Sequence, residues 1–317
     1  MVNPKVYILL INYNGHDDTI KCLKSLLKIT YDNYNILIID NASEKNSFEN
    51  ICTWLESNSV TCNVFHSDND NLTISKEVTI IKSDINLGFG GANNIGFKIA
   101  SMNNVPLVLL LNNDTIVHED FLDCLVNTAV KNERTGMVGG KIYCMNNHRK
   151  IWYCGGWIDY LKGTAYHIEK DLDGKFDSTL ITGCLALINM MGIKDIGFFD
   201  ERFFLNVEDW DLSYRMRKAG WRLIIDTSAI ISHKGSGSIG GPGSLRNLYY
   251  FHRNRLLFFN KHLSPVRKVL FFLCQTVLII PAWIIKQIFT GEVVQIKAFI
   301  LGTSDYVRGR FGKSKRV

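Results

Sequence analysis

The stretch "PLVLLLNNDTIVHED", from Pro106 to Asp120, begins as an almost unbroken apolar run and stops at Asn112, Asn113 and Asp114. Consecutive apolar residues cannot alternate between a buried and a wet face, so the run predicts a strand buried on both sides. Such strands belong to parallel sheets that are covered by helices. Its polar end is then either a turn that stops the strand or a place where a ligand or metal is held.

Upstream of this strand, apolar runs alternate with helical patterns. Three earlier runs predict strands at 5–14, 35–40 and 78–84. The segment 17–29 predicts a helix with Ile20, Leu23 and Leu27 on one face and with Asp17 and Asp18 available as caps. A glycine-rich segment leads into a second helix, which carries Ala92, Ile95 and Ile99. Repeated βα units of this length predict an α/β fold with right-handed crossovers.

After residue 130 the pattern changes to shorter, mixed strands. One helix is well marked in this part, from Glu208 to Gly220, where the glycine ends it. Asp211 and Arg215 are spaced to form an i,i+4 ion pair, which we expect on the outer face of that helix. A mixed sheet flanked by helices is therefore expected over residues 1–245, with a donor half at about 1–120 and an acceptor half at about 121–245.

The composition limits the classes of function. Eight cysteines without a C-x-x-C pair indicate neither a zinc site nor a redox dithiol, so they are expected to be small core residues. No secretory signal begins the sequence, which favours a reduced, cytoplasmic compartment.

The charge is divided unequally along the chain. Residues 246–317 carry 13 Lys or Arg against only Glu292 and Asp305, a net charge of +11, whereas residues 1–245 carry −5. This basic, apolar segment predicts a helical tail that faces an anionic membrane surface. Nucleic acid is the weaker alternative, because no recognition motif accompanies the charge.

The tail contains a 17-residue segment, Val269 to Ile285, without a single charge. Its length lies at the lower limit for a membrane span, and Pro281 is expected to kink it. Three readings stay open: a helix that lies in or dips into the membrane, a helix buried in the core or in a homo-oligomer, and a span.

Four polar clusters follow predicted strands. They are Asn12–Gly15, Asp40–Ser43, Asn86–Gly91 and Asn112–Asp114. One such cluster is typical of a turn, but ligands bind beyond the carboxyl ends of strands in open α/β sheets, so four together favour a binding site.

Charged side chains in two regions suggest the chemistry. Asp114 could bind Mg²⁺ or Mn²⁺, or it could merely cap a following helix. Glu208 and Asp209 begin a helix, where they could act as caps or supply a general base. His233 ends a predicted strand before the glycine-rich segment 234–243, so it is either a surface residue or a second metal ligand followed by a lid.

In this order, "NYNG", "IIDNAS", "NLGFGGANNIG", "LLLNNDT", "TGCLALI" and "GFFDERFFLNVEDWDLSYRMRKAGW" resemble glycosyltransferase family 2 over about residues 5–255. These are inverting sugar-nucleotide enzymes of the GT-A fold, and the likeness extends to rhamnosyltransferase-like members. "YYFHRN" (249–254) resembles the segment that opens the tail in that subgroup.

The resemblance implies a role for each matching residue. Asp209 would be the catalytic base beside Glu208, and Asp114 with His233 would hold Mg²⁺ or Mn²⁺. Asp40 would bind the base or ribose, and the 86–91 loop would close over the nucleotide. The expected donor-binding residues are Asn12, Asn14, Asp40, Asn41, Asn86, Gly88, Gly91, Asn112 and Asn113. Asn112 replaces the first Asp of the family's D-x-D pattern.

We therefore expect an enzyme that transfers one sugar from a nucleoside-diphosphate sugar, with dTDP-rhamnose favoured and a UDP-sugar next, to a lipid-linked or polysaccharide acceptor. It is expected to be attached peripherally to the inner face of the cell membrane. The alternatives are a nucleotidyltransferase and a non-catalytic, sugar-nucleotide-binding membrane scaffold.

Overall fold

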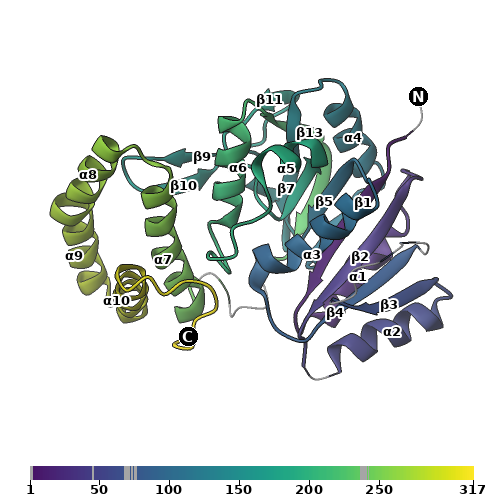
Figure 1. Cartoon of the computed structure of the whole chain (residues 1–317), viewed down its shortest axis with the longest axis horizontal. Helices are drawn as coiled ribbons and strands as arrows, with labels where there is room; N and C mark the ends of the chain where they lie inside the picture. Colours follow the sequence, from purple (N-terminus) through teal and green to yellow (C-terminus); the bar gives the residue numbers. More distant parts are fainter. Residues whose placement is uncertain are drawn as a thin grey trace.

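A computed structural model describes residues 3–44, 46–67, 72, 74, 77–235, 241 and 243–317. The chain forms an α/β body and a helical C-terminal group (Figure 1). The strands are β1 Val6–Asn12, β2 Tyr34–Asn41, β3 Cys62–His66, β4 Val78–Ser83, β5 Leu107–Leu111, β6 Thr115–Val117, β7 Thr135–Cys144, β8 Asn147–Tyr153, β9 Gly156–Asp159, β10 Thr164–His167, β11 Lys175–Asp177, β12 Leu185–Asn189 and β13 Arg222–His233.

Helices cover both faces of the main sheet. α1, α2 and α4 pack on one face, while α3, α5 and α6 pack on the other. The helices of the body are α1 His16–Leu26, α2 Ser47–Ser57, α3 Gly88–Met102, α4 Phe121–Val130, α5 Met190–Ile196 and α6 Glu208–Lys218. Those of the C-terminal group are α7 Leu245–His262, α8 Pro265–Cys274, a π-helical turn η1 Gln275–Ile279, α9 Ile280–Thr290 and α10 Val293–Val307.

The main sheet is mixed, as the sequence predicts. Its order is β11-β13-β7-β12-β5-β1-β2-β4-β3, with β6 beside β13 and β8 beside β7. The strands β1 to β5 run parallel, and β12 is antiparallel to both of its neighbours. All five residues of β5 are buried, which explains why this strand shows no alternation of polar and apolar residues.

Three local expectations are corrected by the structure. Neither Asp17 nor Asp18 caps α1, because its N-cap is Gly15 without a side-chain bond. The segment Gly88–Gly91 is the first turn of α3 rather than a loop. The i,i+4 pair of Asp211 and Arg215 forms at 2.7 Å, but Asp211 is wholly buried instead of lying on an outer face.

A second apolar core joins the α/β body to the C-terminal group. Leu257, Phe258 and Phe259 of α7 pack with Phe203 and Trp210 of the body. This core crosses the division expected at residues 245 and 246, so α7 packs as part of the body that carries the pocket. Beyond α7, the helices α8 and α9 lie farther out at one end of the molecule (Figure 1). The segment after α10 returns to the body, where the Gly312 N–H donates to the Arg202 carbonyl at 2.9 Å.

Candidate functional site

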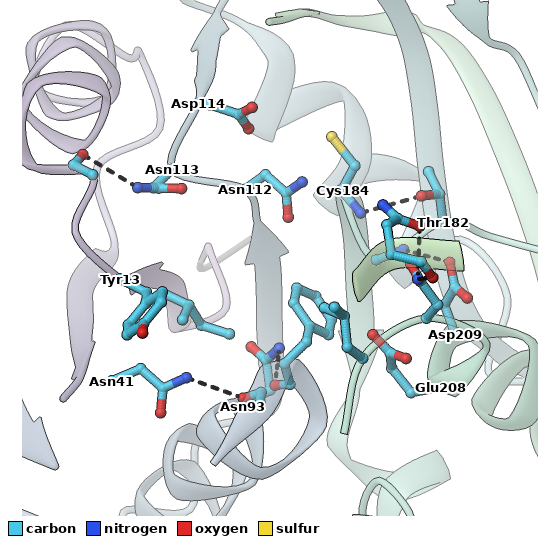
Figure 2. A pocket seen from close by; sticks show the side chains of 18 of the residues that line it. Tyr13, Asn41, Asn93, Asn112, Asn113, Asp114, Thr182, Cys184, Glu208 and Asp209 are labelled. Carbon is cyan, nitrogen blue, oxygen red and sulfur yellow. Dashed lines mark hydrogen bonds between the residues drawn. The ribbon is translucent and has the colours of Figure 1, made fainter. Parts of the chain in front are cut away.

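A pocket of about 450 Å³ opens at the carboxyl ends of β1, β2, β4 and β5. Figure 2 shows Tyr13 and Asn41 on one side and Glu208 and Asp209 on the other, with Asn112 between them. The four polar clusters of the sequence thus reach one edge of the sheet, as predicted. Of the expected donor-binding residues, those on the pocket surface are Asn14, Asn41, Asn86, Gly88, Asn112 and Asn113.

Asn41 and Asn86 shape the turn that leads into α3. The Asn41 Oδ1 accepts from the Leu87 backbone N–H at 2.8 Å, and its Nδ2 donates to the Asn86 Oδ1 at 3.2 Å. The same Asn86 oxygen accepts from the Gly88 N–H at 2.9 Å. The side chains after β2 and β4 therefore fix each other, and with them the first turn of α3.

Asn12, Asp40 and Gly91, which are also expected to bind the donor, are not among the residues that line the pocket. The Asn12 Nδ2 donates to the Asp40 Oδ1 at 2.7 Å, and both side chains are buried below the pocket. Asp40 also accepts from the Ser43 N–H at 3.2 Å. Gly91 faces Leu87 and Glu201 outside the pocket. Asn12 and Asp40 therefore contact the residues that follow β1 and β2 rather than the pocket itself, and Gly91 lies on the other side of α3's first turn.

Asn112 and Asn113 connect the end of β5 to two different neighbours. The Asn113 Nδ2 donates to the Thr19 Oγ1 on α1 at 2.8 Å, while the Asn112 Nδ2 lies 3.4 Å from the His233 Nε2. The turn after β5 therefore contacts α1 through Asn113 and the end of β13 through Asn112.

Asp114 and His233 form a close pair at the pocket edge. The Asp114 Oδ1 lies 3.1 Å from the His233 Nε2, and both side chains are 8% exposed. Asp114 does not cap the next helix, because β6 intervenes and the N-cap of α4 is Asp120. Although burial lowers the pKa of His233, the Cys184 sulfur and the Asp114 carboxylate raise it above its usual value. The Asp114 carboxylate therefore stabilises a positive charge at the position of the His233 ring.

The donor atoms of this pair fit a divalent cation. Two ligands at right angles, each about 2.1 Å from an octahedral ion, lie about 3 Å apart, close to the observed separation. The Asp114 Oδ2 is buried without a hydrogen-bond partner. Among the described residues no group of three or more His, Cys, Asp or Glu is arranged to hold a metal, so the remaining ligands would come from donor phosphates and water. In the predicted lid, residues 236–240 and 242 lie outside the described residues.

Glu208 and Asp209 begin α6 at the opposite side of the pocket. The Asp209 Oδ2 accepts from the Gly183 N–H at 3.2 Å, and its Oδ1 accepts from the Trp210 N–H at 2.9 Å. The Glu208 Oε2 is buried without a partner. The two carboxyl groups therefore differ: one is bound by backbone amides, and the other has an oxygen left free.

Burial raises the pKa of both carboxyl groups by disfavouring their charged forms. It raises the pKa of Asp209 to about 6, against the opposing N–H groups of Gly183 and Trp210. Burial and then the charge of Asp209 raise the pKa of Glu208 to about 8. Two adjacent carboxyl groups avoid carrying two charges at once, and the N–H groups of Gly183 and Trp210 favour the negative charge on Asp209, which suits Asp209 for proton abstraction.

Several pocket residues escaped prediction from the sequence. They are Asn93, Trp152, Thr182, Gly183, Cys184, Phe204, Asn206, Arg246 and Asn247. Thr182, Gly183 and Cys184 precede the antiparallel strand β12, so they reach the pocket from a strand's beginning rather than its end. The "TGCLALI" segment was visible in the sequence, but its direction in the sheet was not.

The model of the family described as glycosyl transferase family 2 matches residues 7–197. The chain belongs to this family. A second model, glycosyl transferase family group 2, matches residues 107–291. The resemblance found in the sequence is thereby confirmed.

Curated relatives of this family 2 member include an N-acetylglucosaminyl-diphospho-decaprenol L-rhamnosyltransferase from Mycobacterium tuberculosis, 26% identical over 207 residues. That match covers 57% of this chain and 66% of the relative. A poly-beta-1,6-N-acetyl-D-glucosamine synthase from Staphylococcus epidermidis is 22% identical over 235 residues, covering 70% of this chain and 50% of the relative. The matched region thus spans from half to just under two thirds of these relatives.

Two solved structures share the fold. GalNAc-T7 with UDP, GalNAc and Mn²⁺ gives a TM-score of 0.61 at 18% identity, over 79% of this chain and 47% of that one. The mannosyltransferase PcManGT from Pyrobaculum calidifontis, in complex with GDP-Man and Mn²⁺, gives 0.59 at 11% identity, over 98% and 89%. The expected GT-A-type α/β fold is confirmed by these likenesses.

Proposed function

We propose that this family 2 member is a metal-dependent, inverting glycosyltransferase that adds one sugar per encounter. The observation that carries this proposal is that one pocket is lined both by a cation-favouring pair, Asp114 and His233, and by a half-buried carboxylate, Asp209. A sugar transfer of this kind needs a base for the acceptor and compensation of charge on the leaving group, and the pocket offers both.

In this mechanism the side chains on the α6 side act on the acceptor. Asp209 takes the proton of the acceptor hydroxyl, whose oxygen bonds to the anomeric carbon on the face opposite the departing nucleoside diphosphate. The bond from that carbon to the diphosphate oxygen breaks with its electron pair, and the configuration inverts. The N–H groups of Gly183 and Trp210 hold the Asp209 carboxylate in place. A divalent cation on Asp114 and His233 would offset negative charge on the diphosphate.

The donor and acceptor are proposed from the relatives and from the tail. The rhamnosyltransferase named above supports dTDP-rhamnose as the first donor to test, with UDP-sugars next, and supports a lipid-linked acceptor in cell-surface glycan synthesis. The mannosyltransferase and GalNAc-T7 complexes both hold Mn²⁺, which supports a divalent metal cofactor here, with Mg²⁺ as the second ion to test.

The C-terminal group supports a place at a membrane surface. The segment Pro265–Thr290 is long and apolar enough to cross a membrane, and only 11% of its most apolar window is buried. This exposure disfavours a helix buried within the chain's own core, whereas a second copy could still cover it. Of the 13 Lys or Arg between 246 and 317, Arg253 and Arg255 are buried. The exposed Lys and Arg of this segment favour an anionic leaflet, so we propose peripheral attachment at the inner face of the cell membrane.

The proposal is tested with a panel of nucleotide sugars and Mn²⁺ or Mg²⁺, measuring thermal stabilisation and slow donor hydrolysis. The substitution Asp209→Asn keeps the shape of the side chain but removes the base. We expect it to retain donor-induced stabilisation and to lose transfer by roughly 10²–10⁴-fold. Unchanged turnover in Asp209→Asn, or no response to any sugar nucleotide, would contradict the proposal.

A further inference from the structure

The loop before the catalytic pair has an unusual backbone. Phe204, Asn206 and Val207 adopt the left-handed conformation, with φ of 61°, 64° and 75°. A bulky aromatic and a β-branched residue rarely adopt it, because the Cβ atom then meets the neighbouring backbone. Such a loop persists only where its surroundings hold it, and Glu208 follows directly.

Asn254 on α7 holds this loop by its backbone. Its Nδ2 donates to the carbonyl oxygens of Phe203 at 2.6 Å, Leu205 at 2.7 Å and Asn206 at 2.9 Å. The Asn254 side chain is fully buried. One amide nitrogen thus gathers three carbonyls from four consecutive residues, which fixes the course of the chain just before α6.

Arg253 fixes the orientation of that amide and holds the loop from its other end. The Arg253 Nε donates to the Asn254 Oδ1 at 2.9 Å, so the Nδ2 of Asn254 is left to face the loop. The Arg253 Nη2 donates to the Arg202 and Phe203 carbonyls at 3.2 and 3.1 Å, and its Nη1 donates to the Gly312 carbonyl at 2.8 Å. This guanidinium, 1% exposed, thereby connects the loop to the C-terminal segment.

The same loop contacts the donor side of the pocket. The Phe89 N–H donates to the Phe204 carbonyl at 2.8 Å, in the first turn of α3. At Gly88 an added Cβ would lie 2.0 Å from the Phe204 carbonyl oxygen, so the two backbones touch there. A displacement of residues 203–207 would therefore move both the catalytic carboxylates and the start of α3.

We propose that Arg253 and Asn254 are positioning residues, which set the place of Glu208 and Asp209 through the backbone of residues 203–207. This inference rests on the proposed function for its catalytic consequence. Neither side chain lines the pocket, so each acts through the loop and not on the substrate.

Asn254→Ala removes the three bonds, and Asn103→Ala is its matched control. The Asn103 Nδ2 also donates to two carbonyls, those of Leu72 and Ile99, both at 2.9 Å, but it lies outside the pocket. In full-length protein we expect Asn254→Ala to lower kcat on the order of 10²-fold, with a smaller change in KM. The control is expected to lower the melting temperature while keeping kcat.

A second readout does not need activity. Burial raises the pKa of Glu208, so the contribution of this group to the stability of the native protein falls as pH rises from about 4.5 to 8. In Asn254→Ala a loosened loop admits water, so we expect this dependence to flatten, whereas Asn103→Ala keeps it. The other charged groups of the pocket are Asp18, Asp114, Asp209, His233 and Arg246, and they are the same in both variants.

The possible results distinguish the positioning role of Arg253 and Asn254 from the proposed function. Wild-type kcat and wild-type pH dependence in folded Asn254→Ala would overturn the positioning role. If Asn254→Ala does not fold, Arg253→Lys is tested instead, because lysine keeps the positive charge but lacks the several N–H donors of the guanidinium. An unchanged kcat and an unchanged pH dependence in Arg253→Lys would also overturn the positioning role. An absence of any sugar transfer in the wild type, with a flattened pH dependence in Asn254→Ala, would refute the proposed function and leave the positioning role standing.

Discussion

Asp114 and His233 place a carboxylate oxygen and an imidazole nitrogen 3.1 Å apart, although one follows β5 and the other ends β13. The register of the sheet brings them together, since His233 on β13 pairs with Thr115 on β6, directly after Asp114. The three-residue strand β6 thus sets the spacing of the two proposed metal ligands.

Removing either ligand should weaken metal binding. We expect Asp114→Asn and His233→Ala each to raise the apparent Kd for Mn²⁺, measured with UDP present, by about 10-fold or more, because few protein ligands are available. Mn²⁺-dependent thermal stabilisation measures this without turnover. His148→Ala, at an exposed position on β8, serves as control. Equal stabilisation of all four proteins would exclude this metal site.

Glu208→Gln should stabilise the folded protein in a pH-dependent way. The pKa of this carboxyl rises from its ordinary value near 4.5 to about 8, so the folded state binds its proton more tightly than the unfolded state. Wild-type stability is therefore lost as pH rises through this window, at most about 1.4 kcal/mol per pKa unit. Denaturation at pH 4 should show little difference between the proteins, and at pH 8 the variant should be more stable. A gap that is constant with pH would refute the buried charge as its cause.

Gly88→Ala should damage both stability and donor binding. Gly88 has a φ of 73°, and an added methyl group would meet the Phe204 carbonyl oxygen at 2.0 Å. The backbone strain alone costs about 1 kcal/mol or more, and relief of the clash must displace the start of α3. Gly174→Ala is the control, because its φ of 95° imposes similar strain in open space. Equal losses of stability and of nucleotide binding in both variants would show that the contact with Phe204 is unimportant.

Polar substitutions on the exposed face of the C-terminal group should weaken membrane binding. Leu273, Leu278 and Phe289 are 57%, 62% and 87% exposed, so Leu273→Ser, Leu278→Ser and Phe289→Ser together leave the second core intact. Burial of each such side chain is worth roughly 1.5–3 kcal/mol, so we expect binding to phosphatidylglycerol vesicles to fall more than 10-fold in a sedimentation assay.

The matched control for this triple variant is Ile85→Ser with Met102→Ser and Met191→Ser, at exposed positions of the body. Phosphatidylcholine vesicles test the contribution of charge. Should the first triple variant bind as tightly as the control, the apolar face does not contact lipid, and a change in oligomeric state would point to a second copy on it.

The parallel half of the sheet could be predicted because its signals are local. Uninterrupted apolar runs such as Leu107–Leu111 require burial on both faces, and the polar residues after them meet at one edge in any parallel arrangement. Periodicity and an ending glycine likewise located α6.

Other features depended on partners far away in the chain. Asp211 has the spacing of a surface ion pair, yet it is buried because Lys261 and His262 of α7 also reach it, at 2.8 and 2.7 Å. Residues 204, 206 and 207 adopt the left-handed conformation, but none of them is a glycine, so the sequence does not indicate it. Their conformation depends on the distant residues Arg253 and Asn254. No local pattern encodes such contacts.

The bond from the Phe89 N–H to the Phe204 carbonyl has a consequence for protein engineering. A chimera that imports the 86–91 segment of a relative, in order to change its sugar nucleotide, would bring in a surface shaped for a foreign 203–207 loop. That loop is in turn shaped by its own α7. The smallest exchangeable unit therefore consists of three separate stretches of sequence, namely residues 86–91, residues 203–207 and α7.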